Sequence, residues 1–310
     1  MSGGGDSSVT ALVFKNEGYQ VQGAILRIRD TDMTPEDIAN GKLPQSIWYS
    51  RETARRLRIG FSIQDARQVY REKVLEPLLN GFANGVQRDP EILCNQQLKR
   101  PMLLQLANQL GCSLIATGHY AIISYDPYNS RYLLRKSVDT SMDQSYMLYY
   151  LSQEELARLR TPLGSYTKEE IRWIAREARL KNAAAPESIV LDSLPDERHM
   201  IRVEQLLQDF YGEGAVQDYR QRTAQRNYAD VLQMGEVNYV SIPGFREETA
   251  SVSVKLRYLP GEKPGTVAAA ADGTLKIQLA APIEVIPGQS IVLYHNDLVL
   301  AGGVLLPGGD

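Results

Sequence analysis

The chain begins with a glycine-rich loop, Ser2-Gly-Gly-Gly-Asp-Ser-Ser8, that runs directly into a helical pattern. Three consecutive glycines let the backbone turn so that successive N–H groups converge on one point, and Ser7 adds a hydroxyl donor. The helix expected from about residue 8 to residue 18 directs its positive end at the same point. The loop therefore predicts a phosphate or pyrophosphate site, where Asp6 could hold Mg²⁺ or accept a hydrogen bond within the loop.

No lysine follows the last glycine of this loop, so the loop differs from the Walker pattern. A flexible glycine-rich segment is the alternative interpretation, but the amphipathic helix and the strand that follow at once argue against it. The loop resembles the SGGxDSS loop of the adenylating pyrophosphatases called PP-loop enzymes. That resemblance implies cleavage of ATP between its α- and β-phosphates, with transfer of AMP to a carbonyl oxygen.

Apolar runs and helical patterns alternate through the first half of the chain. Strands are expected over residues 18–28 and 114–117. Helices are expected over residues 48–57, 69–82 and 95–110, where apolar side chains recur at helical spacing. Such alternation predicts an α/β domain with helices on both faces of a parallel sheet. Two short strands around the turn-forming segment Asp126–Ser130 predict a β-hairpin inserted into this domain.

The pattern changes twice more along the chain. A second helical block spans residues 144–180, and within it Thr167 and Glu170 have the spacing of a capping box. From Val231 onward charge falls, and short apolar strands alternate with turns. These strands are expected over residues 252–258, 266–269, 275–279, 290–293 and 299–304. We therefore expect an α/β nucleotide-binding domain with a helical extension over residues 1–198, a linker over 199–230 and an antiparallel β-barrel over 231–310.

Charge and cysteine content narrow the class of protein. The net charge of −3 argues weakly against a dedicated nucleic-acid binder, because such domains are usually basic. Two cysteines cannot build a disulfide framework, which favours a reducing compartment. No apolar run reaches the length of about 18–20 residues that a membrane span needs, and the start of the chain does not have the pattern of a signal peptide. We therefore expect a cytoplasmic protein.

Cys94 is the candidate nucleophile among these two cysteines. It is expected just before a long helix, where the helix dipole would lower the pKa of the thiol. A buried structural cysteine is the alternative interpretation, and it is the commoner role for a lone cysteine. Cys112, which lies next to an expected core strand, suits that second role.

Several stretches together resemble the tRNA-specific 2-thiouridylase family. They are Met1–Ser8, Asp89–Asn95, Ala116–Tyr120, Asp143–Tyr146, Pro162–Gly164, Val254–Tyr258, Pro287–Ser290 and Ala301–Gly303. They occur in the family's order over nearly the whole chain, and so many ordered matches indicate common ancestry. The resemblance implies a PP-loop, HUP-like adenine-nucleotide-binding domain followed by an antiparallel β-barrel.

The resemblance also implies residue roles. The ATP-binding residues would be Met1, Ser2, Gly3, Gly4, Gly5, Asp6, Ser7, Leu26 and Gly118. The tRNA-binding residues would be Asp89, Pro90, Glu91, His119, Met142, Asp143, Gln144, Arg257, Tyr258 and Gln289. Cys94 would be the catalytic nucleophile.

The reaction implied by the family has two steps. ATP, bound with Mg²⁺ near Asp6, adenylates O2 of the wobble uridine of a tRNA. A sulfur nucleophile then attacks C2 and displaces AMP, which leaves 2-thiouridine. The implied partners are tRNA and a sulfur-relay protein or other persulfide donor supplied by a cysteine desulfurase.

The chain departs from the family at its second catalytic cysteine, which carries the persulfide. An ungapped alignment places Asp192 there, and a carboxylate cannot carry a persulfide. The central domain is shortened to the linker of residues 199–230. The strand that precedes the phosphate loop in the family is absent from this sequence, so we expect the natural start to lie upstream or the chain to be truncated.

Three interpretations follow from these departures. The first is a thiolating enzyme that uses Cys94 alone and takes sulfur from an external persulfide or sulfide. The second is an Fe–S variant with Cys94, Glu91 and Asp192 near a cluster, which is disfavoured because clusters prefer thiolates. The third is a degenerate paralogue that binds tRNA or nucleotide without thiolating. Another adenylating ligase that shares only the phosphate loop is disfavoured by the matches in the β-barrel.

Overall fold

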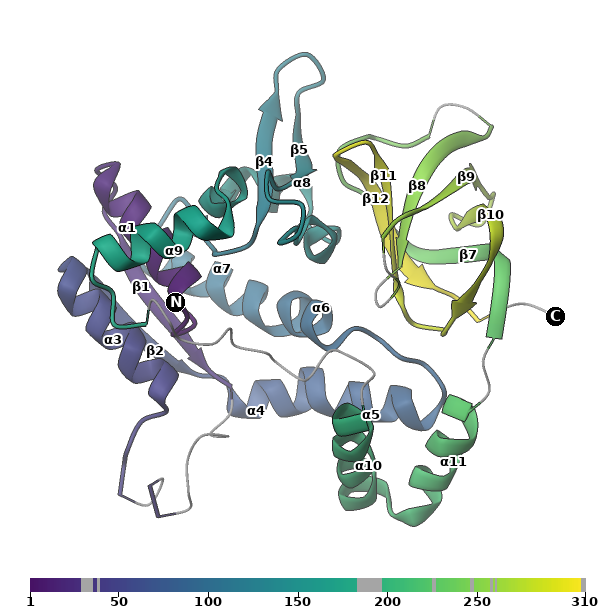
Figure 1. Cartoon of the computed structure of the whole chain (residues 1–310), viewed down its shortest axis with the longest axis horizontal. Helices are drawn as coiled ribbons and strands as arrows, with labels where there is room; N and C mark the ends of the chain where they lie inside the picture. Colours follow the sequence, from purple (N-terminus) through teal and green to yellow (C-terminus); the bar gives the residue numbers. More distant parts are fainter. Residues whose placement is uncertain are drawn as a thin grey trace.

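The structure, a computed structural model, consists of an α/β part and a β-barrel that lie side by side (Figure 1). It describes residues 1–28, 36–37, 40–182, 197–224, 227–245, 248–256, 259 and 261–307, and the side chains of residues 197–202 lie outside this description.

The first strands confirm the expected parallel α/β arrangement. Helix α1 (Gly5–Asn16) leads into β1 (Gln22–Arg27), and α3 (Gln45–Leu57) leads into β2 (Gly60–Asp65). Strands β1 and β2 pair in parallel, with Gln22 opposite Gly60 and Arg27 opposite Asp65. Strand β2 was not predicted, because none of its side chains is fully buried and its apolar pattern is weak.

Two long helical rods follow β2. The first comprises α4 (Arg67–Tyr70), the π-helical turn η1 (Arg71–Leu75) and α5 (Glu76–Ala83). The second comprises α6 (Pro90–Cys94), the π-helical turn η2 (Asn95–Lys99) and α7 (Arg100–Gln109). In both rods a proline, Pro77 or Pro101, follows the π turn. Because proline has no N–H and its ring crowds the preceding turn, a widened π turn lets each rod continue through it.

The next segment contains the expected hairpin and the second helical block. Strand β3 (Ile115–Ala116) precedes the hairpin of β4 (Ala121–Asp126) and β5 (Arg131–Lys136). The block then runs through η3 (Ser145–Leu148), α8 (Gln153–Arg158), β6 (Leu159–Arg160), η4 (Pro162–Ser165) and α9 (Lys168–Glu177). The capping box of Thr167 and Glu170 is present at α9. Within the described ranges, the parallel pair β3–β6 stands apart from the pair β1–β2.

Two helices occupy most of the expected linker. They are α10 (Glu197–Tyr211) and α11 (Glu213–Ala224), which form a helical hairpin against α5 (Figure 1). Val203, Leu207, Val216 and Tyr219 from this hairpin are buried in one cluster with the two helical rods. The segment is therefore an ordered part of the α/β core.

The C-terminal part is a closed antiparallel barrel of six strands. They are β7 (Asn227–Tyr239), β8 (Ala250–Leu256), β9 (Lys263–Ala269), β10 (Leu275–Val285), β11 (Ser290–His295) and β12 (Leu298–Leu305). The order β11-β8-β9-β10-β7-β12 closes through the pairing of β11 with β12. Strand β5 of the hairpin joins the barrel at one point, where Arg135 pairs with Leu298. Strand β7 was not among the predicted strands, and its first four residues lie within the expected linker of residues 199–230.

Candidate functional site

The glycine-rich loop leaves the first turn of α1 open at its N-terminal end. Gly4 is the N-cap of α1, and no described side chain caps this end. The backbone N–H of Ser2 donates to the hydroxyl of Ser7 over 2.9 Å, which folds the loop over the start of the helix. Uncapped N–H groups and the helix dipole favour an anion here, so the geometry suits the expected phosphate site.

Gly3 and Gly118 allow the loop to pack tightly. Gly3 has a φ of +87°, and a Cβ there would lie 2.6 Å from the backbone of Ser46 in α3. At Gly118 a Cβ would lie 3.2 Å from backbone atoms of Asp6 and Ser7. The structure therefore brings Gly118, which follows β3, against the start of α1. This is the neighbourhood in which the family resemblance places it.

Asp6 is held by two residues from distant parts of the chain. The ammonium of Lys168, at the first position of α9, lies 2.8 Å from one carboxylate oxygen of Asp6. The hydroxyl of Tyr120 donates to the other oxygen over 3.1 Å, and Lys168 also lies 5.3 Å from the centre of the Tyr120 ring. Tyr120 is fully buried. Lys168 therefore supplies the cation that the loop's own sequence lacks.

Lys168 and a second residue at the loop, Asn182, were missed from the sequence. Asn182 lies five residues after the end of α9, is 1% exposed and donates from its amide to the carbonyl oxygens of Gly3 and Gly4. Lys168 reaches its partner Asp6 across 162 residues of sequence. The capping box placed Lys168 at a helix start, but nothing local to either residue indicated the loop as its partner.

His119 lies beside the loop in a neutral form. Burial, together with the positive charge of Lys99, lowers the pKa of His119 to about 4. Its Nδ1 lies 2.9 Å from the hydroxyl of Thr117. At neutral pH the ring therefore carries no charge, and it can offer a hydrogen bond but no ionic attraction.

Cys94 lies deeper than the sequence indicated. The helix starts at Pro90, because Asp89 caps it by accepting hydrogen bonds from the N–H groups of Glu91 and Ile92. Cys94 is therefore one turn inside the helix rather than before it. Its side chain is fully buried in the cluster that also holds Leu98 and Leu207. The dipole of the helix acts on the first turn, so the expected position of the thiol at the helix start is wrong.

The second cysteine is remote from the first. Cys94 and Cys112 lie near opposite ends of the rod of α6, η2 and α7, which separates them by roughly 25 Å at the helical rise of about 1.5 Å per residue. Two cysteines so far apart cannot form a disulfide without a large rearrangement. Both cysteines are free thiols in the structure.

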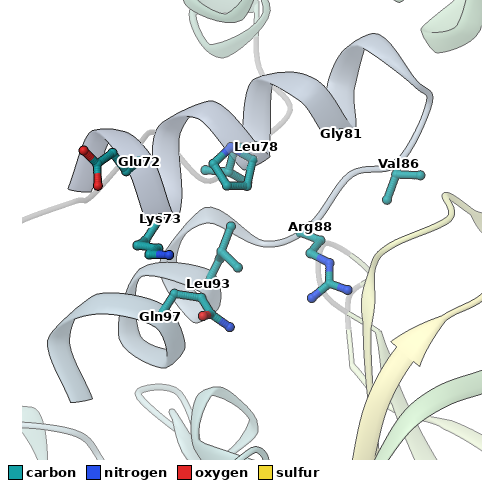
Figure 2. Close-up of a pocket in the computed structure, with 9 residues that line it drawn as sticks. Glu72, Lys73, Leu78, Gly81, Val86, Arg88, Leu93 and Gln97 are labelled. Atoms are coloured by element: carbon teal, nitrogen blue, oxygen red, sulfur yellow. The ribbon is translucent and has the colours of Figure 1, made fainter. Parts of the chain in front are cut away.

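A cavity of about 350 Å³ lies beside the helix of Cys94 (Figure 2). Its walls come from the first rod, the segment after it and α6–η2. They are formed by Glu72, Lys73, Pro77, Leu78, Gly81, Val86, Arg88, Leu93 and Gln97. Leu93 and Gln97 flank Cys94 in sequence, whereas Cys94 itself does not line the cavity. The lining of the cavity combines apolar side chains with charged ones of both signs, namely Glu72, Lys73 and Arg88.

Barrel loops contact the segment just before Asp89. Arg88 forms an ion pair with Glu236 of β7. The N–H of Gln87 donates to the carbonyl of Pro287 over 2.7 Å. The neighbouring Gln289 is only 4% exposed, and its side-chain oxygen accepts a hydrogen bond from Ile286. The barrel is thus fixed against the entrance to the cysteine helix.

The segment Met142–Gln144 makes mainly internal contacts. Asp143 accepts hydrogen bonds from the N–H groups of Ser137 and Ser145, and its burial raises the pKa of the carboxyl. Gln144 bonds twice to the backbone of Tyr120, through its side chain over 3.1 Å and its N–H over 2.8 Å. Met142 packs with the cluster around Val9. The structure therefore uses these side chains to fix the hairpin beside the phosphate loop.

Of the remaining expected site residues, some lie within the residues that the structure describes and others lie outside them. Leu26 is half-buried near the end of β1 and packs on the cluster that holds Cys94. Met1 lies against β1, where its amine donates to the carbonyl of Ala24. Asp192, Arg257 and Tyr258 lie outside the described residues. In the described part of the chain, no group of three or more His, Cys, Asp or Glu side chains is arranged to hold a metal ion.

No described helix is both long and apolar enough to cross a membrane.

The fold defines an α/β protein with parallel strand pairs and an appended antiparallel β-barrel. A family model described as the tRNA methyl transferase HUP domain matches residues 1–191, and one described as the aminomethyltransferase beta-barrel domain matches residues 229–305. The chain belongs to this family, whose curated relatives are named tRNA-specific 2-thiouridylases.

Three of these relatives cover nearly the whole chain. The tRNA-specific 2-thiouridylase MnmA 2 of Caldanaerobacter subterraneus is 30% identical, over 98% of this chain and 96% of its own length. The MnmA proteins of Clostridioides difficile and Acetivibrio thermocellus are 29% and 30% identical over 98% of this chain. The first alignment spans 350 positions, more than the 310 residues here, so that relative carries residues without a counterpart in this chain.

Proposed function

We propose that this protein is a tRNA-uridine 2-sulfurtransferase that uses ATP. Membership of the 2-thiouridylase family supports the substrate class and the reaction. One observation in this structure carries the proposal. The ion pair of Asp6 and Lys168 lies at the N-terminal end of α1, which no described side chain caps. That arrangement suits a polyphosphate with a bound divalent cation, and ATP supplies the leaving pyrophosphate.

The first step activates the base. O2 of the wobble uridine attacks the α-phosphorus of ATP, an O–P bond forms and pyrophosphate leaves. The N–H groups of the loop and the ammonium of Lys168 would stabilise the charge that builds up on the leaving pyrophosphate. Asp6 would hold Mg²⁺ together with phosphate oxygens, since Mg²⁺ is commonly bound by one or two carboxylates and substrate phosphates. Leu26 and Gly118 would complete the nucleotide site.

The second step delivers sulfur. A sulfur nucleophile bonds to C2 of the uridine and AMP leaves, which converts the adenylated carbonyl into a thiocarbonyl. We propose that the Cys94 thiolate takes the terminal sulfur from an external persulfide donor, which leaves the donor as a thiolate, because Asp192 stands where the family has its persulfide cysteine. The outer sulfur of the Cys94 persulfide bonds to C2 as AMP leaves. The donor thiolate then attacks Sγ of Cys94, which breaks the S–S bond, releases 2-thiouridine and leaves a disulfide between Cys94 and the donor. Since Cys94 is fully buried, its helix has to move before the thiol can react.

The tRNA would approach between the cysteine helix and the barrel. Asp89, Pro90, Glu91 and His119 are proposed near the target base, with Arg257 and Tyr258 on the barrel side. Arg pairs with phosphate, and Tyr stacks on an unpaired base. The contacts made by Met142–Gln144 and Gln289 support a positioning role for them beneath this surface.

We propose that residues 199–230 replace a longer central domain. We also propose that the protein acts in the cytoplasm.

The decisive experiment measures the product. The protein is expressed in a strain that lacks its own thiouridylase, and its tRNA is analysed by mass spectrometry for 2-thiouridine. The proposal expects 2-thiouridine at the wobble position. Unmodified tRNA despite a folded protein that binds ATP would contradict it.

A second function is favoured by the burial of Cys94 and by Asp192 at the persulfide position. It is that of a paralogue which binds tRNA or nucleotide without transferring sulfur. The same strain distinguishes the two, because the paralogue would bind ATP and tRNA and leave the uridine unmodified. An iron–sulfur variant predicts a coloured protein that contains iron, which metal analysis of the purified protein tests.

A further inference from the structure

Asn182 is a buried amide that is attached to the phosphate loop at three points. Its Nδ2 lies 2.9 Å from the carbonyl oxygens of Gly3 and Gly4 and 2.8 Å from the hydroxyl of Ser8. The residue is 1% exposed. It lies beyond the end of α9, so these contacts join the loop to a segment more than 170 residues away.

A backbone anion site needs its carbonyl oxygens turned away from the anion. In the loop, N–H groups can converge on a phosphate only if the carbonyls of the same peptides point to the other side, because an inward carbonyl oxygen would repel the phosphate. Outward carbonyls that are buried need hydrogen-bond donors. Asn182 supplies a donor to two of them, Gly3 and Gly4, at the point where the loop turns into α1.

The orientation of the Asn182 amide follows from these neighbours. If the amide were reversed, its oxygen would face the two carbonyl oxygens, which is repulsive. In the observed orientation, Oδ1 is buried and has no hydrogen-bond partner among the residues that the structure describes. A buried acceptor without a partner is unfavourable. This unfavourable burial of Oδ1 is offset by the hydrogen bonds that Nδ2, at the other end of the amide, donates to the loop.

Ser8 completes the arrangement. Two N–H bonds of the amide serve three nearby acceptors, and the hydroxyl of Ser8 itself donates to the carbonyl of Gly4 over 3.1 Å or contacts Thr53 over 3.3 Å. Because the Ser7 hydroxyl also lies 3.2 Å from this oxygen, the Gly4 carbonyl has donors from three side chains. This peptide is held more firmly than a turn of three glycines would be by itself.

We infer that Asn182 is a positioning residue for nucleotide binding, which holds the loop carbonyls outward so that the loop N–H groups face the phosphates of ATP. The inference rests on the proposed ATP site at this loop. It concerns the affinity for ATP and does not involve the sulfur step.

The test replaces Asn182 by Asp and by Ala. Asn182→Asp keeps the shape but exchanges the donor for an oxygen that faces two carbonyls, whereas Asn182→Ala removes the donor without adding charge. A matched control exists in Asn238, whose amide likewise donates to two backbone carbonyls, those of Tyr149 at 2.6 Å and Leu151 at 3.0 Å, far from the loop. Calorimetry then measures the Kd for MgATP, and thermal unfolding is followed with and without ATP.

The inference expects both Asn182 variants to bind ATP about 10- to 100-fold more weakly, as expected for a loss of about 1–3 kcal/mol, and to lose most of the ATP-induced rise in Tm. The Asn238→Asp and Asn238→Ala variants should keep the wild-type affinity for ATP even where their Tm falls. If Asn182→Asp does not fold, Asn182→Ala carries the test, because it introduces no repulsion.

Other outcomes separate the possibilities. A lower Tm with unchanged ATP affinity of the folded Asn182 variants shows a purely structural role and overturns the inference, while the proposed function stands. Wild-type protein that does not bind ATP at all overturns both. An equal loss of affinity in the Asn238 variants also overturns the inference, because the effect would then not be specific to the loop.

Discussion

The phosphate loop and the cysteine helix are built in opposite ways. The loop is held by three residues from other parts of the chain, Lys168, Tyr120 and Asn182. Their contacts leave the N-terminal end of α1 without a side-chain cap. The cysteine helix is capped by Asp89, and its Cys94 is closed within an apolar cluster. The proposed nucleotide site is thus preorganised, whereas the proposed nucleophile Cys94 is closed off and its helix has to move. We therefore expect ATP binding to be separable from sulfur transfer.

The largest effect is expected for Cys94→Ser. If Cys94 is the nucleophile, the rate of 2-thiouridine formation should fall by about a thousandfold or more, because a hydroxyl is a poor substitute for a thiolate. The affinity for ATP should stay at the wild-type value. Single-turnover assays with tRNA measure the first quantity and calorimetry the second. Cys112→Ser is the control and should thiolate normally, whereas full activity in Cys94→Ser would reject the assignment.

Lys168→Met tests the nucleotide half. It removes the cation and leaves the carboxylate of Asp6 with the Tyr120 hydroxyl as its remaining side-chain partner in the described structure. We expect ATP to bind roughly 10- to 100-fold more weakly. The control is Lys181→Met. Lys181 is an exposed lysine paired with Glu52, so its replacement should leave the affinity for ATP unchanged. Equal ATP affinities of the two variants would show that Lys168 takes no part in binding.

Gly3→Ala should destabilise the protein through the contact of the loop with α3. Gly18 is a matched control, since its φ of +86° equals that of Gly3 within 1°, but no atom lies within 4 Å of its absent Cβ. Both substitutions incur the strain of a positive φ, and only Gly3→Ala adds the clash with Ser46. We expect Gly3→Ala to lower the free energy of unfolding by about 2 kcal/mol more than Gly18→Ala. Urea unfolding measures the difference. Equal decreases in the free energy of unfolding would mean that the loop shifts away from Ser46 at little energetic cost.

The last prediction concerns pH. The unfolded state binds a proton at His119 below about pH 6.5, whereas the folded state binds it only below about pH 4. Between these values the unfolded state holds more protons, so the free energy of unfolding should fall as the pH is lowered, by at most about 1.4 kcal/mol per pH unit. His119→Asn should flatten this part of the profile, measured by urea unfolding at several pH values. His295→Asn, at an exposed position, should leave the profile as it is, and an unchanged profile in His119→Asn would refute the prediction.

Local patterns were enough to predict much of the fold. The glycines of the loop, the capping box at Thr167 and the turn residues at Asp126–Ser130 each act within a few positions, and the structure confirms the elements they indicate. Five of the six barrel strands were predicted for the same reason, whereas β7 was not predicted. Strand β2 was missed because its side chains are only partly buried, and α10 and α11 were missed because the segment was treated as a shortened connection.

The candidate site was predicted only in part, for a physical reason. The loop, Gly118 and Cys94 belong to local motifs, whereas Lys168 and Asn182 contact the loop through tertiary packing that no local pattern encodes. The depth of Cys94 could have been inferred, because Asp89 followed by Pro90 is a typical N-cap and first helical residue. Reading the helix from that cap would have placed the thiol one turn inside it.

The hairpin of β4 and β5 acts as a mechanical link between the two parts of the molecule. It starts directly after Tyr120, whose hydroxyl holds Asp6, and β5 joins the barrel through Arg135, which pairs with Leu298 and bonds to Asp297. Because the hairpin contacts both the barrel and Tyr120, a displacement of the barrel relative to the α/β part would strain the hydrogen bond between the Tyr120 hydroxyl and Asp6.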